Sequence, residues 1–84
     1  MKTNFISTKE RLPEVGKLVW LYDSKRKIIY LGERAVVNGK WLWAVSYDKP
    51  YLFKDKITAD CQIDDAYDFD YWCEVQEIPE IKTK

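Results

Sequence analysis

The chain has 84 residues, with 14 basic and 14 acidic side chains, 4 Trp, 6 Tyr and 3 Phe residues, two cysteines and no histidine. Its length allows one hydrophobic core, so we expect a single domain over residues 1–84. The lack of histidine excludes Ser-His-Asp and Cys-His catalytic sites within the chain and removes the commonest zinc ligand. No stretch resembles a signal peptide or a membrane span, so a cytoplasmic location is expected.

Residues 1–16 are predicted to form a strap on the body of the domain, because Pro13 and Gly16 prevent a long helix. Apolar side chains would hold this strap in place, namely Phe5, Ile6, Leu12 and Val15. Residues 17–23 are apolar on both sides of the alternation and predict a strand covered on both faces. A solvated turn is expected over residues 24–27.

The clearest local signal is Asn38-Gly39 between two β-rich runs, residues 27–37 and 40–47. This dipeptide indicates a hairpin, because both central positions of a type I′ turn need a positive φ. The turn predicts a register that pairs Val37 with Lys40, Arg34 with Trp43, and Tyr30 with Tyr47. One face of the hairpin then carries an arginine among aromatic rings: Tyr30, Arg34, Trp41, Trp43 and Tyr47.

The second half of the chain predicts two further strands after a short apolar plug at residues 51–53. Residues 57–63 alternate between apolar and polar, and so do residues 69–75 after a loop at residues 64–67. If these two strands form a hairpin, Cys61 faces Asp70 and Cys73 faces Thr58, so the two cysteines are expected to be free thiols. Residues 82–84 are expected to be a frayed tail.

These elements predict a mainly β fold, in which about five short strands form a small antiparallel sheet curled into an SH3-like or OB-like half-barrel. A short helical turn near residues 60–67 is the competing detail.

The two ends of the chain, FISTKERLPEVGKLVWLYD and FDYWCEVQEIPE, resemble a family of short phage and prophage proteins, the domain of unknown function 551 family. An aromatic-Ile-Ser start, a Leu-Pro-x-x-Gly turn, a Val-rich strand and a late Trp before a proline carry the resemblance, at Phe5, Ile6, Ser7, Leu12, Pro13, Gly16, Val19, Trp72 and Pro79. The family has no assigned chemistry. The resemblance therefore implies a small accessory protein made inside a bacterial host, with no catalytic residues to transfer.

Charge is unevenly distributed along the chain, because residues 1–56 hold 12 basic and 6 acidic side chains and residues 57–84 hold 2 basic and 8 acidic ones. An acidic surface of this kind can attract a basic partner, including a protein that processes nucleic acid. The alternative is that the acidic strands pair with the basic hairpin within the same domain, so that the charges cancel locally.

Trp72 is the most informative single residue of the acidic half. If Phe69, Tyr71 and Cys73 face the core, the alternation of the strand places Trp72 outward between Asp70 and Glu74, where an exposed Trp would act as an interaction hot spot. The alternative is that the strap covers Trp72, with Phe5 or Leu12 as the lid. The candidate surface for binding a partner comprises Trp72, Asp70, Glu74, Asp68, Asp65 and Asp64.

The leading hypothesis is a non-enzymatic accessory protein of phage type that binds a bacterial host protein through this acidic surface. The alternative function is nucleic-acid or nucleotide binding by the hairpin face of Tyr30, Arg34, Trp41, Trp43 and Tyr47, although these rings also suit a core. No cofactor or metal is expected, because the acidic run from Asp64 to Asp70 lacks the order of a calcium loop. A membrane partner is not expected.

Overall fold

The structure is a computed structural model that describes residues 4–75 of the chain. Within that range the secondary structure is entirely β, and no helical turn forms near residues 60–67. The strands are β1 (Ile6–Ser7), β2 (Val19–Asp23), β3 (Ile28–Val37), β4 (Lys40–Ser46), β5 (Tyr51–Phe53), β6 (Lys56–Thr58), β7 (Gln62–Ile63) and β8 (Tyr71–Glu74). The predicted tail at residues 82–84 lies outside the described residues.

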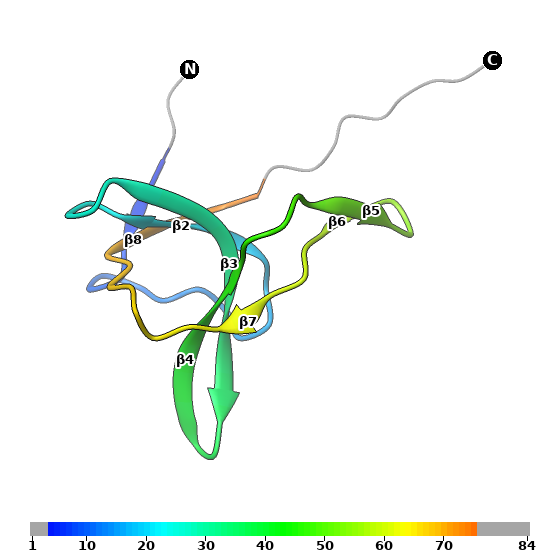
Figure 1. The fold of residues 1–84 in the computed structure, drawn as a ribbon. Helices are drawn as coiled ribbons and strands as arrows, with labels where there is room; N and C mark the ends of the chain where they lie inside the picture. The colour runs from blue at the N-terminus through cyan, green and yellow to red at the C-terminus, as the bar shows by residue number, and fades with distance from the viewer. Residues whose placement is uncertain (1–3, 76–84) are drawn as a thin grey trace.

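Six strands form one antiparallel sheet in the order β1-β8-β2-β3-β4-β7, and β5 and β6 form a separate two-stranded sheet. The large sheet is open and strongly curved (Figure 1), which confirms the predicted mainly β half-barrel. More strands form than expected because residues 57–63 divide between β6 and β7, because residues 51–53 form β5, and because the strap contributes β1.

The core lies on one face of this sheet, to which alternate residues of the strands point. Its buried members come from four segments: Val19, Leu21, Trp43, Val45, Phe69 and Trp72. Ile6 and Leu12 from the strap and Tyr30 and Tyr67 pack against this cluster. Strand β2 is buried on one face and half-buried on the other, which is less covered than the sequence predicts.

The β3–β4 hairpin has the predicted register, since Val37 pairs with Lys40 and Arg34 pairs with Trp43. Asn38 and Gly39 have φ values of 52° and 80°, as a type I′ turn requires. Figure 1 shows that the distal part of this hairpin extends beyond the rest of the sheet. Both faces of that part are therefore available to solvent or to a partner.

The predicted hairpin between residues 57–63 and 69–75 is wrong. Strand β8 pairs instead with β2 and β1, and β7 pairs with β4. Leu21 of β2 lies directly opposite Trp72, so the two side chains share the core face of the sheet. The long-range pairing with β2 sets the orientation of β8, so Trp72 faces the core and Tyr71 is exposed, contrary to the prediction, whereas Phe69 and Cys73 are buried as predicted.

Residues 51–53 do not form an apolar plug. They form β5, which pairs with β6 in a short hairpin that projects from the body (Figure 1), and we call residues 49–58 the arm. All three side chains of β5 are exposed. The sequence signal was ambiguous because a buried plug and a solvent-exposed strand have the same apolar composition.

A buried carboxylate closes the turn between β2 and β3. Asp23 accepts hydrogen bonds from the backbone N–H groups of Lys25 and Arg26 and forms a 2.8 Å ion pair with the guanidinium of Arg26. The hydrogen bond from the Arg26 side chain holds the pKa of Asp23 below its usual value, against the opposing effect of burial. The predicted solvated turn thus has a fully buried anchor.

Candidate functional site

The predicted aromatic face of the hairpin exists, but most of it belongs to the core. Trp43 is only 8% exposed, and Tyr30 is half-buried. Tyr67 and Phe69, from the segment between β7 and β8, cover this face. The aromatic rings on this face form a continuous series of contacts in the order Tyr47, Tyr30, Tyr67, Phe69, Trp43 and Trp41. Neighbouring ring centroids in this series are 5.2, 5.5, 5.3, 6.1 and 5.1 Å apart, respectively. Only Trp41 and Tyr47, at the two ends of this series, are classed as exposed.

Tyr47 is held by a carboxylate, because its hydroxyl donates a hydrogen bond to Asp64. This bond raises the pKa of Tyr47 and lowers that of Asp64. A hydrogen bond with Tyr67 similarly raises the pKa of Tyr30. At the tyrosine end of the face, the phenol groups and the Asp64 carboxylate therefore form hydrogen bonds with one another.

The tryptophan end of the face is different, because apolar side chains there remain exposed beside a fixed guanidinium. Val36 and Trp41 are direct cross-strand partners and are 53% and 42% exposed. Val15 of the strap, which is 50% exposed, bridges to Arg34 on the neighbouring strand. Paired residues point to the same side of a sheet, so these four side chains form one surface. We call Val15, Arg34, Val36 and Trp41 the tip surface.

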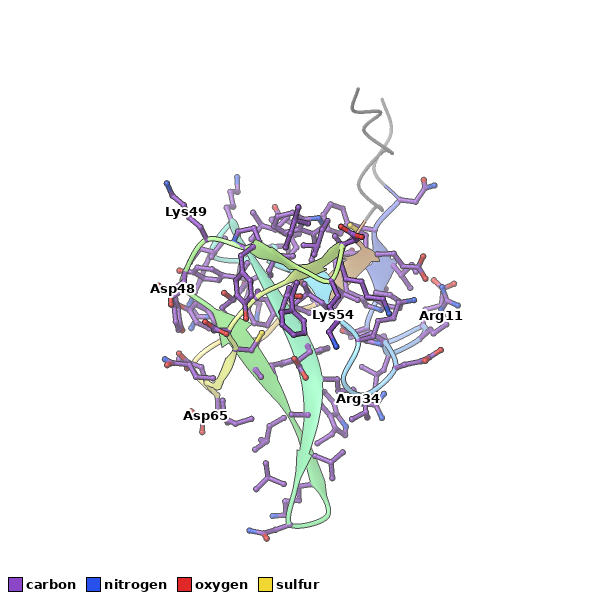
Figure 2. All side chains as sticks on the ribbon, turned by 90° about the vertical axis from the view of Figure 1, so that its right-hand side faces the viewer. Arg11, Arg34, Asp48, Lys49, Lys54 and Asp65 are labelled. Atoms are coloured by element: carbon purple, nitrogen blue, oxygen red, sulfur yellow. The ribbon has the colours of Figure 1, made fainter. Side chains whose placement is uncertain are left out.

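Arg34 is held in place at the tip surface by two contacts. Its Nη1 donates a 2.9 Å hydrogen bond to the carbonyl oxygen of Pro13, and its guanidinium lies 5.6 Å from the ring centroid of Trp41. The Nε–H group is buried without an acceptor among the described residues. Figure 2 shows Arg34 next to the strap. A pre-positioned guanidinium loses little entropy when a ligand binds to it.

The six residues predicted to bind a partner do not form one surface. Asp70 accepts hydrogen bonds from the backbone and hydroxyl of Ser24, and these outweigh the opposing effect of burial and lower its pKa. Glu74 forms a 2.9 Å ion pair with Lys17, which lowers the pKa of Glu74. Asp64 is engaged by Tyr47, as described above. Of these six residues, only Asp65 and Asp68 are exposed and form no ion pair within residues 4–75.

Trp72 is not the exposed anchor that strand alternation predicts. It is 3% exposed, its Nε1 donates a 2.8 Å hydrogen bond to the carbonyl oxygen of Arg11, and the guanidinium of Arg11 lies 5.4 Å from its ring centroid. The alternative in which the strap covers Trp72 is the one that the structure shows. The lid is formed by Leu12 and Ile6, whereas Phe5 packs on Tyr22 at a centroid distance of 5.6 Å.

Ion pairs neutralise little of the charge asymmetry along the chain. Within residues 4–75, a single ion pair joins the basic part to the acidic part, and it links Lys17 to Glu74. Other carboxylates of the acidic part accept hydrogen bonds from neutral hydroxyls, as Asp60 does from Tyr51 at 3.0 Å. Figure 2 shows Asp65 on the side of the molecule away from Arg11.

The two cysteines are free, as predicted, and Cys73 is buried. Burial raises the pKa of the Cys61 thiol from 9.0 to about 11, and Glu33 adds to this effect. The described residues bring no three His, Cys, Asp or Glu side chains together in a metal-binding group. They also include no helix with the length and apolar character that a membrane crossing requires.

Alkylation of Cys61 in the folded protein is expected to be about 100-fold slower at pH 8 than alkylation of an unfolded thiol, because only the thiolate reacts. Iodoacetamide labelling followed by mass spectrometry measures this rate, and the rate should rise up to about pH 11. Because the pKa is higher in the folded state, the preference for the neutral thiol stabilises the fold below pH 9 and is lost as the pH rises towards 11. A Cys61→Ala variant gives the background from Cys73. Native labelling as fast as that in urea would contradict the prediction.

Sequence reasoning found Arg34 and Trp41 but missed the exposure of β5 and the role of the strap in holding Arg34. The separation of β5 from the main sheet depends on long-range pairing, which the local sequence pattern does not show. Comparisons of the chain with protein-family models, with curated proteins and with solved structures found no match, so the resemblance to phage and prophage proteins stays a prediction.

Proposed function

We propose that this protein acts by binding rather than by catalysis, and that it docks on another protein through the tip surface. The observation that carries the proposal is the exposed ring of Trp41, which is stacked by the fixed guanidinium of Arg34 and flanked by Val15 and Val36. The tip surface replaces the Trp72 surface as the proposed anchor, because Trp72 is buried.

The composition of the tip surface supports protein recognition. Trp and Arg are enriched among the residues that dominate binding energy at protein interfaces. The type I′ turn and the bond to Pro13 hold the surface in one conformation, which reduces the entropy lost on binding. Exposed valines around a Trp would exclude water from its contacts once a partner covers them.

The partner that we propose is a protein of a bacterial host, in the cytoplasm, as the resemblance to phage and prophage proteins implies. A defence protein or a nucleic-acid-processing protein suits this setting. The exposed carboxylates of Asp65 and Asp68 support a basic partner, because they would attract it over long range without forming the centre of the interface.

Trp41→Ala is expected to weaken binding to the partner by about 30-fold or more, since truncation of a central interface Trp costs about 2 kcal/mol or more. Affinity capture from a bacterial lysate identifies partners of the wild-type chain, and titration with the purified partner measures the loss. Tyr71→Ala is the matched control, because Tyr71 is an exposed aromatic residue of β8 that lies outside the tip surface. Equal affinity of the Trp41→Ala and wild-type chains would contradict the proposal.

Nucleic-acid binding is the second candidate function, and the stacking of Arg34 on Trp41 favours it because single-stranded bases stack on such groups. A salt titration with single-stranded DNA and RNA separates the two candidates. Tight binding that Trp41→Ala abolishes would replace the protein-docking proposal. Trp43→Ala is not a suitable variant for testing nucleic-acid binding, because Trp43 is part of the core.

A further inference from the structure

The arm is the second exposed apolar feature of the molecule, and it is separate from the tip surface. Tyr51, Leu52 and Phe53 are 45%, 58% and 59% exposed. Strands β5 and β6 pair only with each other among the described strands (Figure 1). A depression of about 210 Å³ on the arm is lined by Pro50, Tyr51, Leu52 and Ile57. The arm thus exposes three consecutive large apolar side chains and an apolar hollow.

An arm of this kind has little stability of its own. A two-stranded hairpin is marginally stable in water without a third strand or a covering layer. Its turn adds strain, because Lys54 and Asp55 have φ values of 52° and 65° and neither residue is glycine. A surface that covers β5 would supply the missing stabilisation.

The free edge of β5 has a defined hydrogen-bonding pattern. The two-residue turn at Lys54 and Asp55 makes Phe53 and Lys56 a hydrogen-bonded pair, so the backbone groups of Leu52 point away from β6. Pro50 has no N–H group to donate. The outer edge of β5 therefore offers one complete pair of donor and acceptor groups, at Leu52.

The sequence around Leu52 is complementary to itself when two copies run antiparallel. With Leu52 opposite Leu52, Tyr51 lies opposite Phe53 of the second copy. This contact occurs twice across the twofold axis, which gives two aromatic pairs.

We propose that the protein forms a twofold dimer in which β5 of one copy pairs antiparallel with β5 of a second copy, centred on Leu52. The resulting four-stranded sheet gives each arm a third strand and sets the exposed side chains of β5 beside those of the second copy. The zero net charge of the chain removes long-range repulsion between copies. Because Pro50 interrupts the edge, pairing stays short and closes as a dimer.

The first test is the oligomeric state, measured by sedimentation velocity over a range of concentrations. The wild-type chain of 10.1 kDa is expected to reach the mass of a dimer as concentration rises. Leu52→Asp should weaken dimerisation by about tenfold or more, because it places two carboxylates together on the axis. Ile29→Asp is the matched control, since Ile29 is 48% exposed on β3, away from the arm. Trp41→Ala should leave the dimer intact, so this proposal and the proposed function can fail separately.

The second test fixes the register with cysteine variants in a Cys61→Ala background. Directly opposed residues have Cα atoms about 5.5 Å apart, within the range of a disulfide. Leu52→Cys is therefore expected to form a linked dimer under mild oxidation, whereas Phe53→Cys, which faces Tyr51 of the second copy, should link far less.

Four results would overturn the proposal. Three of them are a wild-type chain that remains monomeric at the highest concentration reached, a dimer that Leu52→Asp leaves unchanged, and equal cross-linking of the two cysteine variants. Assemblies larger than a dimer would also overturn it, because they require open rather than closed pairing of the edges.

Discussion

Gly32→Ala is expected to destabilise the protein by about 3 kcal/mol, at the upper end of the range for overpacked sites. A Cβ atom at Gly32 would lie 2.6 Å from Cδ1 of Leu21 and would collide with the carbonyl oxygen of Ala44. That carbonyl belongs to the backbone of the paired strand β4, so it cannot move without breaking the β3–β4 pairing. The gain from a less flexible unfolded chain, about 0.4–1 kcal/mol, is too small to compensate. Urea denaturation monitored by Trp fluorescence measures the change in the free energy of unfolding.

Gly39→Ala provides the control for this prediction. A Cβ atom at Gly39 would meet no atom within 4 Å, but φ there is +80°, so the cost is backbone strain alone and amounts to about 1–2 kcal/mol. Gly32→Ala is expected to destabilise the protein more than Gly39→Ala does. The reverse order would show that the strands of the hairpin separate easily at Gly32, contrary to the tight packing of Leu21 in the core.

Local signals predicted the hairpin well. Asn38-Gly39 sets the turn, and the alternation of side chains along a strand then determines which residues share a face. The pairing of Arg34 with Trp43 could therefore be predicted without any knowledge of the rest of the fold. The free state of Cys61 and Cys73 was also predicted correctly, although the register used to derive it was wrong.

Long-range pairing could not be predicted in the same way. The alternation of residues 69–75 does not show which side of the strand faces the core. Only the pairing of β8 with β2 and β1 determines that Trp72 faces inward. Residues 57–63 also alternate, but β6 joins the arm and β7 joins the main sheet. Both errors arose from assigning partners by proximity in the sequence.

In the candidate site, too, the features that depend on local sequence were predicted and those that depend on long-range contacts were not. Arg34 and Trp41 were predicted together because they belong to one hairpin, whereas the exposure of Trp41 depends on where Tyr67 and Phe69 stop covering the face. The acidic side chains were predicted as one surface from their closeness in sequence. Their separation follows from bonds to distant residues, such as Asp70 to Ser24 and Glu74 to Lys17.

Trp72→Ala is expected to destabilise the protein by about 3–5 kcal/mol, the usual cost of removing a buried large aromatic side chain. Trp72 is 3% exposed, packs in the core cluster and lies opposite Leu21, so its removal leaves a cavity that the paired strands β2 and β8 cannot close. It also frees the strap, because the hydrogen bond from Nε1 to Arg11 and the stacking of the Arg11 guanidinium are both lost. Urea denaturation and limited proteolysis of the strap measure the two effects.

Trp72→Phe separates the packing of the ring from its hydrogen bond. It keeps most of the buried apolar area and loses only the hydrogen bond to the carbonyl oxygen of Arg11, which is an exposed residue. The free energy of unfolding is therefore expected to fall by a smaller amount, about 1–2 kcal/mol. An exposed interface Trp would behave differently, because surface substitutions usually change stability by less than about 0.5 kcal/mol. If Trp72→Ala left the free energy of unfolding unchanged and weakened partner binding, Trp72 would be the anchor after all. Loss of stability with Trp72→Ala, together with normal stability and lost binding in Trp41→Ala, assigns the core to Trp72 and the interface to Trp41.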